Sequence, residues 1–250
     1  MRNSFLALAS REKIKEYKIN YVKFEEELAK EINYLYLYKE RPFNIDLGCE
    51  ALNKIFEGLN FGNIIDIYGP SRTGKTQICF QLSLMASLKG YHVYYVDSKG
   101  TFRPERIEEM AKNRNLNFNM DKVKYYRIND YLEQVNLTEK LSKSLIKPSI
   151  LIIDDFAYNF LSIRKGLLLR PSLLVKNLQE ISNLSLKEDL LTLITNQVKW
   201  VNEEVTKKVK DFVHRRVGLK RLNGVVLANI DEFPSKRLKF KIDSKGIIDL

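Results

Sequence analysis

The stretch Ile64-Ile-Asp-Ile-Tyr-Gly69-Pro-Ser-Arg-Thr-Gly74-Lys75-Thr76 decides the fold of this chain. Its first half is an apolar run typical of a buried strand, and its second half fits the pattern G-x-x-x-x-G-K-[ST] at the start of a helical segment. Glycines in such a loop let backbone N–H groups turn inward, and the helix N-terminus adds a partial positive charge. This combination predicts a P-loop (Walker A) that holds the phosphates of a nucleotide.

The residues of this loop have expected places around ATP and Mg²⁺. Lys75 is expected to reach the β- and γ-phosphates, and the Thr76 hydroxyl to be a ligand of Mg²⁺. A second Mg²⁺ residue is expected at Asp154, which ends the apolar strand Ile150–Asp154, although an acid at a strand end can also be a simple surface residue. The set expected at ATP from the loop is Gly69, Pro70, Ser71, Arg72, Thr73, Gly74, Lys75, Thr76 and Gln77.

The rest of the chain alternates short β-branched runs with helical segments. The runs are Ile64–Tyr68, Tyr91–Val96, Val123–Tyr126, Ile150–Asp154 and Leu190–Thr195, with helices expected near 75–89, 104–113, 131–146 and 171–187. This alternation predicts an α/β fold with a mostly parallel sheet flanked by helices. Two later strands, Gly224–Ile230 and Lys236–Ile242, are expected to form an antiparallel pair. The expected organisation is a core over 43–250 after a helical N-terminal extension over 1–42.

The composition narrows the function classes. Of 250 residues, 42 are Lys or Arg and 31 are Asp or Glu, so the net charge is +11 and an anionic partner is the first suspicion. Two cysteines and two histidines are too few for a disulfide framework or a His/Cys metal cluster. The sequence lacks a signal-peptide layout and an apolar run of the roughly 18 residues that a membrane helix needs. We expect a cytoplasmic protein without membrane contact.

Much of the excess charge lies late in the chain. Residues 199–241 contain twelve Lys and Arg against five acids, a net charge of +7. A basic stretch with aromatic residues is the usual design for sequence-independent binding of single-stranded DNA. The alternative is an amphipathic helix, because Val201, Val205 and Val209 keep helical spacing. The residues expected at DNA here are Lys199, Trp200, Lys207, Lys208, Lys210, Arg215, Arg216, Lys220 and Arg221.

Four segments resemble the RadA-type recombinases, the archaeal and eukaryotic branch of the RecA family. They are Ile45–Leu59, Thr73–Cys79, Gly100-Thr-Phe-Arg-Pro-Glu-Arg106 and Thr195-Asn-Gln-Val198, in the same order and spacing. The resemblance covers about residues 43–250. It implies a RecA-like fold, binding of ATP and single-stranded DNA, and a role in homologous recombination and DNA repair.

The resemblance also implies roles for single residues. Arg106 matches an arginine that packs on the adenine ring, and Gln197 matches a glutamine that senses the γ-phosphate and relays it to a DNA-binding loop. Lys75, Thr76, Asp154 and Gln197 are therefore expected to carry the chemistry. Residues 161–171 lie where the family has its first DNA loop, so Arg164, Lys165 and Arg170 are expected at DNA; the apolar Leu167–Leu169 favours a protein interface instead.

The sequence departs from the family at the catalytic acid. Full recombinases have Glu directly before Gly-Thr-Phe-Arg, whereas this chain has Lys99. A lysine with an ordinary pKa is protonated at neutral pH and cannot act as a base. Because a general base typically raises the reaction rate by about 10²–10⁴-fold, we expect weak or no ATP hydrolysis. Asp155 is an alternative base, and a capping or surface role is the other interpretation of that residue.

Two more features of the family are missing. With these losses the chain resembles an accessory paralog of the RadB or RadC type more than the recombinase itself. The stretch before the core is too short for the helical DNA-binding domain, and it lacks the Phe-x-x-Ala motif that links protomers, so we do not expect long homofilaments. Tyr34–Tyr38 could replace that interface or simply pack in the core.

The function expected is an accessory protein of recombination, in which ATP acts as an affinity switch for DNA. Its protein partner is left open between the main recombinase and another paralog. The alternatives are a DNA-stimulated ATPase with strand-exchange activity and a RecA-fold signalling ATPase that binds no DNA.

Overall fold

The computed structural model describes residues 41–161, 170–197, 209–235 and 237–250. Residues Pro42–Leu250 form one compact unit. The helical extension expected over 1–42 lies outside the described residues except for its last two positions. Arg164, Lys165, Lys199, Trp200, Lys207 and Lys208 also lie outside them.

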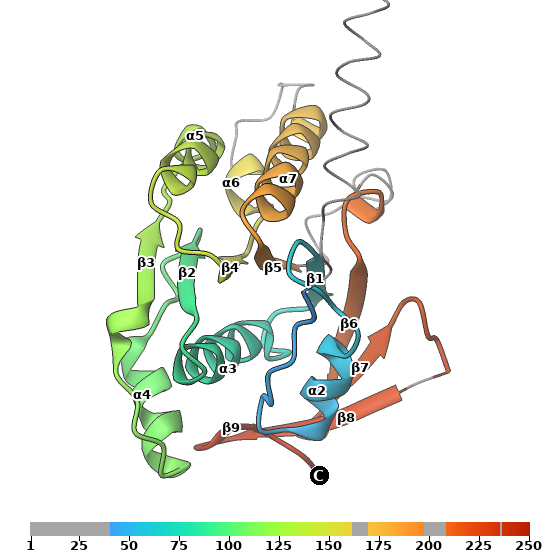
Figure 1. The fold of residues 1–250 in the computed structure, drawn as a ribbon. Helices are drawn as coiled ribbons and strands as arrows, with labels where there is room; N and C mark the ends of the chain where they lie inside the picture. Colours follow the sequence, from blue (N-terminus) through green and yellow to red (C-terminus); the bar gives the residue numbers. More distant parts are fainter. Residues whose placement is uncertain (1–40, 162–169, 198–208, 236) are drawn as a thin grey trace, which may run out of the picture. The chain divides into compact units, whose positions relative to one another are not determined.

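One mixed sheet of nine strands organises this unit, in the order β3-β2-β4-β5-β1-β6-β7-β8-β9 (Figure 1). The strands are β1 Ile64–Gly69, β2 His92–Asp97, β3 Val123–Arg127, β4 Ser149–Asp154, β5 Leu190–Gln197, β6 Arg215–Leu222, β7 Val225–Ile230, β8 Arg237–Asp243 and β9 Gly246–Ile248. Strands β3 through β6 run parallel, and β6 through β9 pair antiparallel. The predicted α/β class with a parallel sheet is confirmed.

Helices cover both faces of the parallel strands. Figure 1 shows α5, α6 and α7 on one face and α2, α3 and α4 on the other. Their bounds are α2 Glu50–Phe56, α3 Lys75–Leu88, α4 Pro104–Asn113, α5 Tyr131–Ser142, α6 Tyr158–Leu161 and α7 Arg170–Lys187, with a short 3₁₀ helix over Met120–Lys122. Each helical layer closes its own hydrophobic core against the sheet. Central strands buried on both faces need continuous apolar runs, and β4 is buried at every position.

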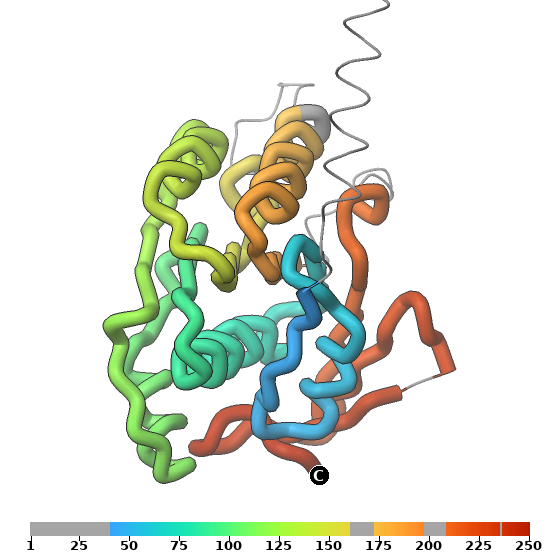
Figure 2. Tube along the Cα trace, viewed as in Figure 1, coloured from blue at the N-terminus to red at the C-terminus, as the bar shows by residue number. Residues whose placement is uncertain are grey.

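Local sequence explains where several helices begin. Pro104 opens α4, where its missing N–H costs nothing. The Asp130 carboxylate accepts the Glu133 N–H at 2.9 Å and so caps α5. Helix α2 is capped from the other end of the chain, because the Asp249 carboxylate accepts the Glu50 N–H at 2.8 Å. Figure 2 accordingly traces the C-terminal strands, in red, running beside α2, in blue.

The structure differs from the sequence prediction mainly after residue 210. Residues 215–222 form β6, parallel to β1, where the sequence suggested a basic loop or a charged helix. The expected antiparallel pair is part of a run of four strands, β6 to β9. The sequence did not predict β6 because its cations resemble a charged surface segment. In the structure Arg216 is buried and Lys220 is exposed on this strand. The apolar spacing of the alternative helix is partly explained, since Val209 is buried and Phe212 and Val213 pack against the core.

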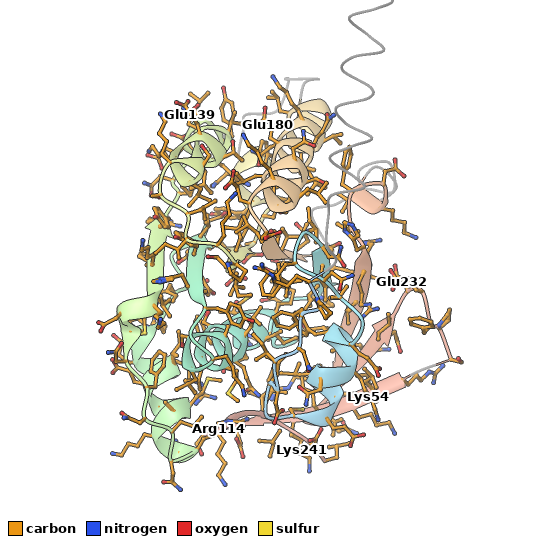
Figure 3. All side chains as sticks on the ribbon, viewed as in Figure 1. Lys54, Arg114, Glu139, Glu180, Glu232 and Lys241 are labelled. Atoms are coloured by element: carbon orange, nitrogen blue, oxygen red, sulfur yellow. The ribbon has the colours of Figure 1, made fainter. Side chains whose placement is uncertain are left out.

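Charged side chains mostly lie outside this framework. Figure 3 shows Lys54, Glu139 and Lys241 at the periphery, and all three are exposed. None of the described helices combines the length and apolar composition that spanning a bilayer requires.

Candidate functional site

The loop from Gly69 to Thr76 joins the end of β1 to the start of α3, and its glycines are needed at both ends. Gly74 has φ of 99°, and a Cβ there would lie 2.6 Å from Cδ1 of Ile242. A Cβ on Gly69 would lie 2.6 Å from the backbone oxygen of Leu219 on β6. A larger residue at Gly69 would collide with the backbone of β6, and at Gly74 the positive φ strains any residue that carries a Cβ.

The side chain of Lys75, the first residue of α3, reaches back to the start of the loop. Its side chain is largely buried, and Nζ donates to the carbonyl oxygens of Gly69 at 3.0 Å and Pro70 at 2.8 Å. Burial lowers the pKa of Lys75, and the carboxylates of Asp155 and Asp154 oppose that shift. The ammonium is therefore held at the centre of a loop built to receive anionic oxygens.

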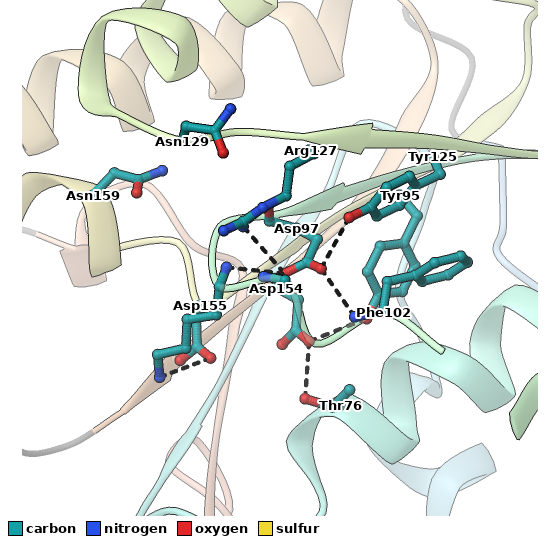
Figure 4. A network of polar contacts seen from close by, with 12 residues as sticks. Thr76, Tyr95, Asp97, Phe102, Tyr125, Arg127, Asn129, Asp154, Asp155 and Asn159 are labelled. Atoms are coloured by element: carbon teal, nitrogen blue, oxygen red, sulfur yellow. Dashed lines mark hydrogen bonds and ion pairs between the residues drawn. The ribbon is translucent and has the colours of Figure 1, made fainter. Parts of the chain in front are cut away.

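Asp154 and Thr76 meet at the base of the site although 78 positions separate them in the chain. The Thr76 hydroxyl donates to Oδ2 of Asp154 at 2.8 Å, and the Thr195 hydroxyl donates to Oδ1 at 2.6 Å. Tyr95 adds a third hydrogen bond at 3.1 Å, and Figure 4 shows Thr76 and Tyr95 beside the carboxylate of Asp154. Burial raises the pKa of Asp154, whereas the hydrogen bond from Thr195 lowers it.

This oxygen pair fits Mg²⁺. A hydroxyl and a carboxylate are ligands that Mg²⁺ accepts, and it typically takes one or two protein carboxylates with substrate phosphates and water. The described residues hold no cluster of three or more His, Cys, Asp or Glu that could bind a metal. A metal at Thr76 and Asp154 would therefore need phosphate oxygens to complete its coordination.

A pocket of about 470 Å³ opens above the loop. It lies where strands β1, β4 and β5 end, the usual place for a ligand in an open α/β sheet. The register aligns these ends, since Gly69 of β1 pairs with Gln197 of β5. The lining includes four cations, Arg72, Lys75, Lys99 and Arg221, and among the described residues that line it Asp155 supplies the one carboxylate. The surplus of positive charge suits a polyanion.

Asp97 arranges the segment beside this pocket, and the sequence analysis did not single it out. It is fully buried at the end of β2, next to Asp154 in register. Its carboxylate accepts the backbone N–H groups of Lys99 at 2.9 Å, Gly100 at 2.7 Å and Phe102 at 2.9 Å (Figure 4). An acid closing an apolar strand is the same signal that identified Asp154, and it could have identified Asp97.

Lys99 turns toward the pocket from this segment. Its Nζ lies 3.0 Å from Oδ2 of Asp155 and donates to Oε1 of Gln197 at 3.2 Å. It also lies 5.2 Å from the ring centroid of Tyr158. Asp155 has φ of 60°, a left-handed conformation that is uncommon outside glycine and often marks a functional site.

With this geometry in place, a comparison with protein families is decisive. The model of the Rad51 family matches residues 39–249, which include the whole described core. The chain belongs to the Rad51 family. Rad51-family proteins are RecA-type recombinases with roles in recombination and repair, and they bind ATP with Mg²⁺ and single-stranded DNA as general family properties.

Two residues given roles by the resemblance to recombinases lie in different settings in this Rad51-family core. Gln197 lines the pocket. Arg106 is not among the described residues that line it. Its guanidinium donates to Oε1 of Gln77 at 2.9 Å, to the Ser244 carbonyl at 3.1 Å and to the Asp243 carbonyl, which joins α3 to the β8–β9 turn. The adenine contact of Arg106 stays a prediction.

Two of the arginines expected at DNA have structural partners instead. Arg216 is buried, with Nε 2.9 Å from Oδ2 of Asp66 and its guanidinium 4.3 Å from the Tyr68 ring. Arg215 donates to the carbonyl oxygens of Ile55 at 2.9 Å and Glu57 at 2.6 Å. Each guanidinium therefore has partners within the fold, and the contact of this pair with DNA stays a prediction.

The other described residues that the sequence predicts at DNA are Arg170, Lys210, Lys220 and Arg221. Arg221 lines the pocket above the loop and donates to the Arg72 carbonyl at 3.4 Å, and its contact with DNA stays a prediction. Lys210 and Lys220 are exposed and remain candidates for DNA. Arg170 is the first residue of α7.

Proposed function

We propose that this Rad51-family chain is an accessory recombination protein of the RadB or RadC type, in which MgATP acts as an affinity switch and is hydrolysed slowly. The observation that carries the proposal is the Lys99–Asp155 ion pair at 3.0 Å in the lining of the pocket, which Thr76 also lines. An ammonium stands where active relatives place their catalytic carboxylate.

Nucleotide binding follows from the arrangement of the loop. Lys75 and the backbone N–H groups of residues 71–76 would hold the phosphates, and Thr76 with Asp154 would hold Mg²⁺. Bound MgATP supplies the terminal phosphate and the metal charge that offsets it. Gln197, at the end of β5, would report the presence of that phosphate to the residues that follow it.

Slow turnover follows from the residue type at position 99. A general base must accept a proton from water, and a lysine ammonium has no lone pair with which to accept one. Asp155 is the other residue that could serve as the base, and it forms an ion pair with Lys99 in the structure. Loss of a general base costs about 10²–10⁴-fold in rate, which leaves binding as the main consequence of ATP.

DNA binding is proposed for Lys210 and Lys220, which are exposed, and for Arg170 at the start of α7. Arg164, Lys165, Lys199, Lys207 and Lys208, which lie outside the described residues, are the other cations proposed at DNA, and Trp200, also outside them, is the aromatic residue proposed to stack on a base. The protein partner we propose is the main recombinase or another paralog in the cytoplasm, with no long homofilament.

The test is a joint titration of nucleotide and single-stranded DNA. We expect ATP and DNA to strengthen each other's binding by the same factor, because coupling between two sites is reciprocal. DNA affinity should fall steeply between 50 and 200 mM salt, and turnover should stay slow with DNA present. Turnover of several per second with joint-molecule formation would refute the proposal in favour of an active recombinase. Absence of DNA binding at low salt would favour a signalling ATPase.

A further inference from the structure

Lys99 contacts groups from several elements around the pocket. Its backbone is held by Asp97 after β2, and its ammonium contacts Asp155 after β4 and Gln197 at the end of β5. The same ammonium lies over the ring of Tyr158, the first residue of α6. One cation therefore joins the ends of three adjacent strands and the start of a helix.

The present partners of Lys99 can be exchanged for an anion. Its side chain is 23% exposed and lines the pocket with Lys75 and Thr76. An ammonium has three donors and turns freely on a four-carbon stem. A terminal phosphate carries more charge than one carboxylate, and Lys99 and Asp155 both line the pocket.

Asp155 is positioned to hold Lys99 when that phosphate is missing. Its left-handed backbone is fixed by the N–H, which donates to Oγ1 of Thr195 at 2.8 Å. The same Thr195 hydroxyl donates to Asp154, so Asp155 is tied to the predicted Mg²⁺ residue. The carboxylate therefore competes with phosphate for Lys99 from a position that the fold maintains.

We propose that Lys99 is the residue by which this chain distinguishes a nucleoside triphosphate from a diphosphate. It exchanges the Asp155 carboxylate and the Gln197 amide for oxygens of the terminal phosphate, and this exchange frees the end of β5 and the start of α6. The inference rests on the proposed function, since it requires that the pocket binds a nucleotide.

The test compares equilibrium affinities for a non-hydrolysable β,γ-imido triphosphate and for ADP, both with Mg²⁺. In Lys99→Met the triphosphate affinity should fall about tenfold, the scale of a charge-assisted hydrogen bond, while ADP affinity changes less than threefold. Lys112→Met, an exposed lysine on α4 outside the pocket lining, is the matched control and should leave both affinities unchanged.

Asp155→Asn should change triphosphate affinity in the opposite direction. It also tests whether Asp155 acts by competing with phosphate for Lys99 or only through its own negative charge. It should raise triphosphate affinity about threefold or more in the native background, because Lys99 is released. In the Lys99→Met background the same change should have a clearly smaller effect, so a double-mutant cycle isolates the coupling. Equal effects in both backgrounds would show that Asp155 acts by its own charge, and would overturn the exchange.

Hydrogen exchange of Tyr158–Leu161 gives a readout that does not depend on affinity. The triphosphate analogue should speed exchange there in the native protein and leave it unchanged in Lys99→Met. If Lys99→Met keeps the native ratio of triphosphate to diphosphate affinity, the inference about Lys99 is wrong although the proposed function stands. If the native protein binds neither nucleotide, the proposed function itself fails.

Discussion

Replacing Arg216 with methionine tests whether this arginine belongs to the fold or to DNA binding. The side chain is buried on β6, and Nε forms an ion pair with Asp66 at 2.9 Å. Asp66 is 1% exposed, and Nδ2 of Asn196 also donates to its carboxylate at 2.8 Å. Methionine fills similar space without charge, so the variant leaves a buried carboxylate without its cation.

The expected cost is about 4 kcal/mol of unfolding free energy. Removing one partner of a buried ion pair costs about 3–5 kcal/mol. The stacking of Arg216 on Tyr68 adds about 0.5–1 kcal/mol, and the contact with Asp231 at 3.6 Å adds little because that acid is 27% exposed. For a domain of this size the loss corresponds to a fall in Tm of about 8–16 °C.

The loss should depend on pH in a defined direction. Burial raises the pKa of Asp66, and Arg216 opposes that shift, so the variant should raise it further. A carboxyl with a raised pKa in the folded state favours folding when protonated and loses this contribution as the pH rises. The difference in stability between variant and native protein should therefore shrink from pH 7 toward pH 4.

Urea unfolding at several pH values measures this difference. Lys220→Met on the same strand is the control and should change stability by less than about 0.5 kcal/mol, because Lys220 is exposed. Adding Asp66→Asn to Arg216→Met should recover about 2 kcal/mol by removing the isolated charge. A loss below 1 kcal/mol together with weaker DNA binding would refute the structural assignment of Arg216.

Three further outcomes follow from the site and its supports. Gly74→Ala should weaken nucleotide binding and cost about 1–3 kcal/mol in thermal unfolding, because residue 74 has φ of 99°, which strains any residue that carries a Cβ; an unaffected variant would contradict the geometry. Thr195→Val removes a 2.6 Å hydrogen bond to Asp154, so Mg²⁺-dependent nucleotide affinity, measured by calorimetry, should fall about tenfold while affinity without Mg²⁺ stays the same. Asp249→Ala removes the cap of α2 and should cost about 1 kcal/mol at pH 7. The pKa of Asp249 is lowered, with burial opposing the hydrogen bonds that lower it, so this stabilisation is lost as the pH falls below about 4; a loss independent of pH would contradict the capping role.

The phosphate loop and the parallel sheet were readable from local sequence. Glycines around Lys75 and apolar runs such as Ile150–Asp154 are short-range patterns, and each element they predict is stabilised by its own residues and by burial on both faces. Strand β6 could not be predicted, because it mixes cations with apolar residues. The burial of Arg216 on this strand depends on Asp66, which lies 150 positions earlier in the chain.

The sequence alone determined the chemistry available to this chain: a loop for phosphate, acids at strand ends and a lysine where its relatives carry a glutamate. These are properties of residue type and short spacing, which survive in any arrangement of the chain. Tertiary structure decided which charges face a ligand and which are used inside. It paired Arg216 with Asp66, turned Arg221 toward the phosphate loop and placed Lys99 between Asp155 and Gln197. Charge acts through distance and burial, and only the folded chain sets these two quantities.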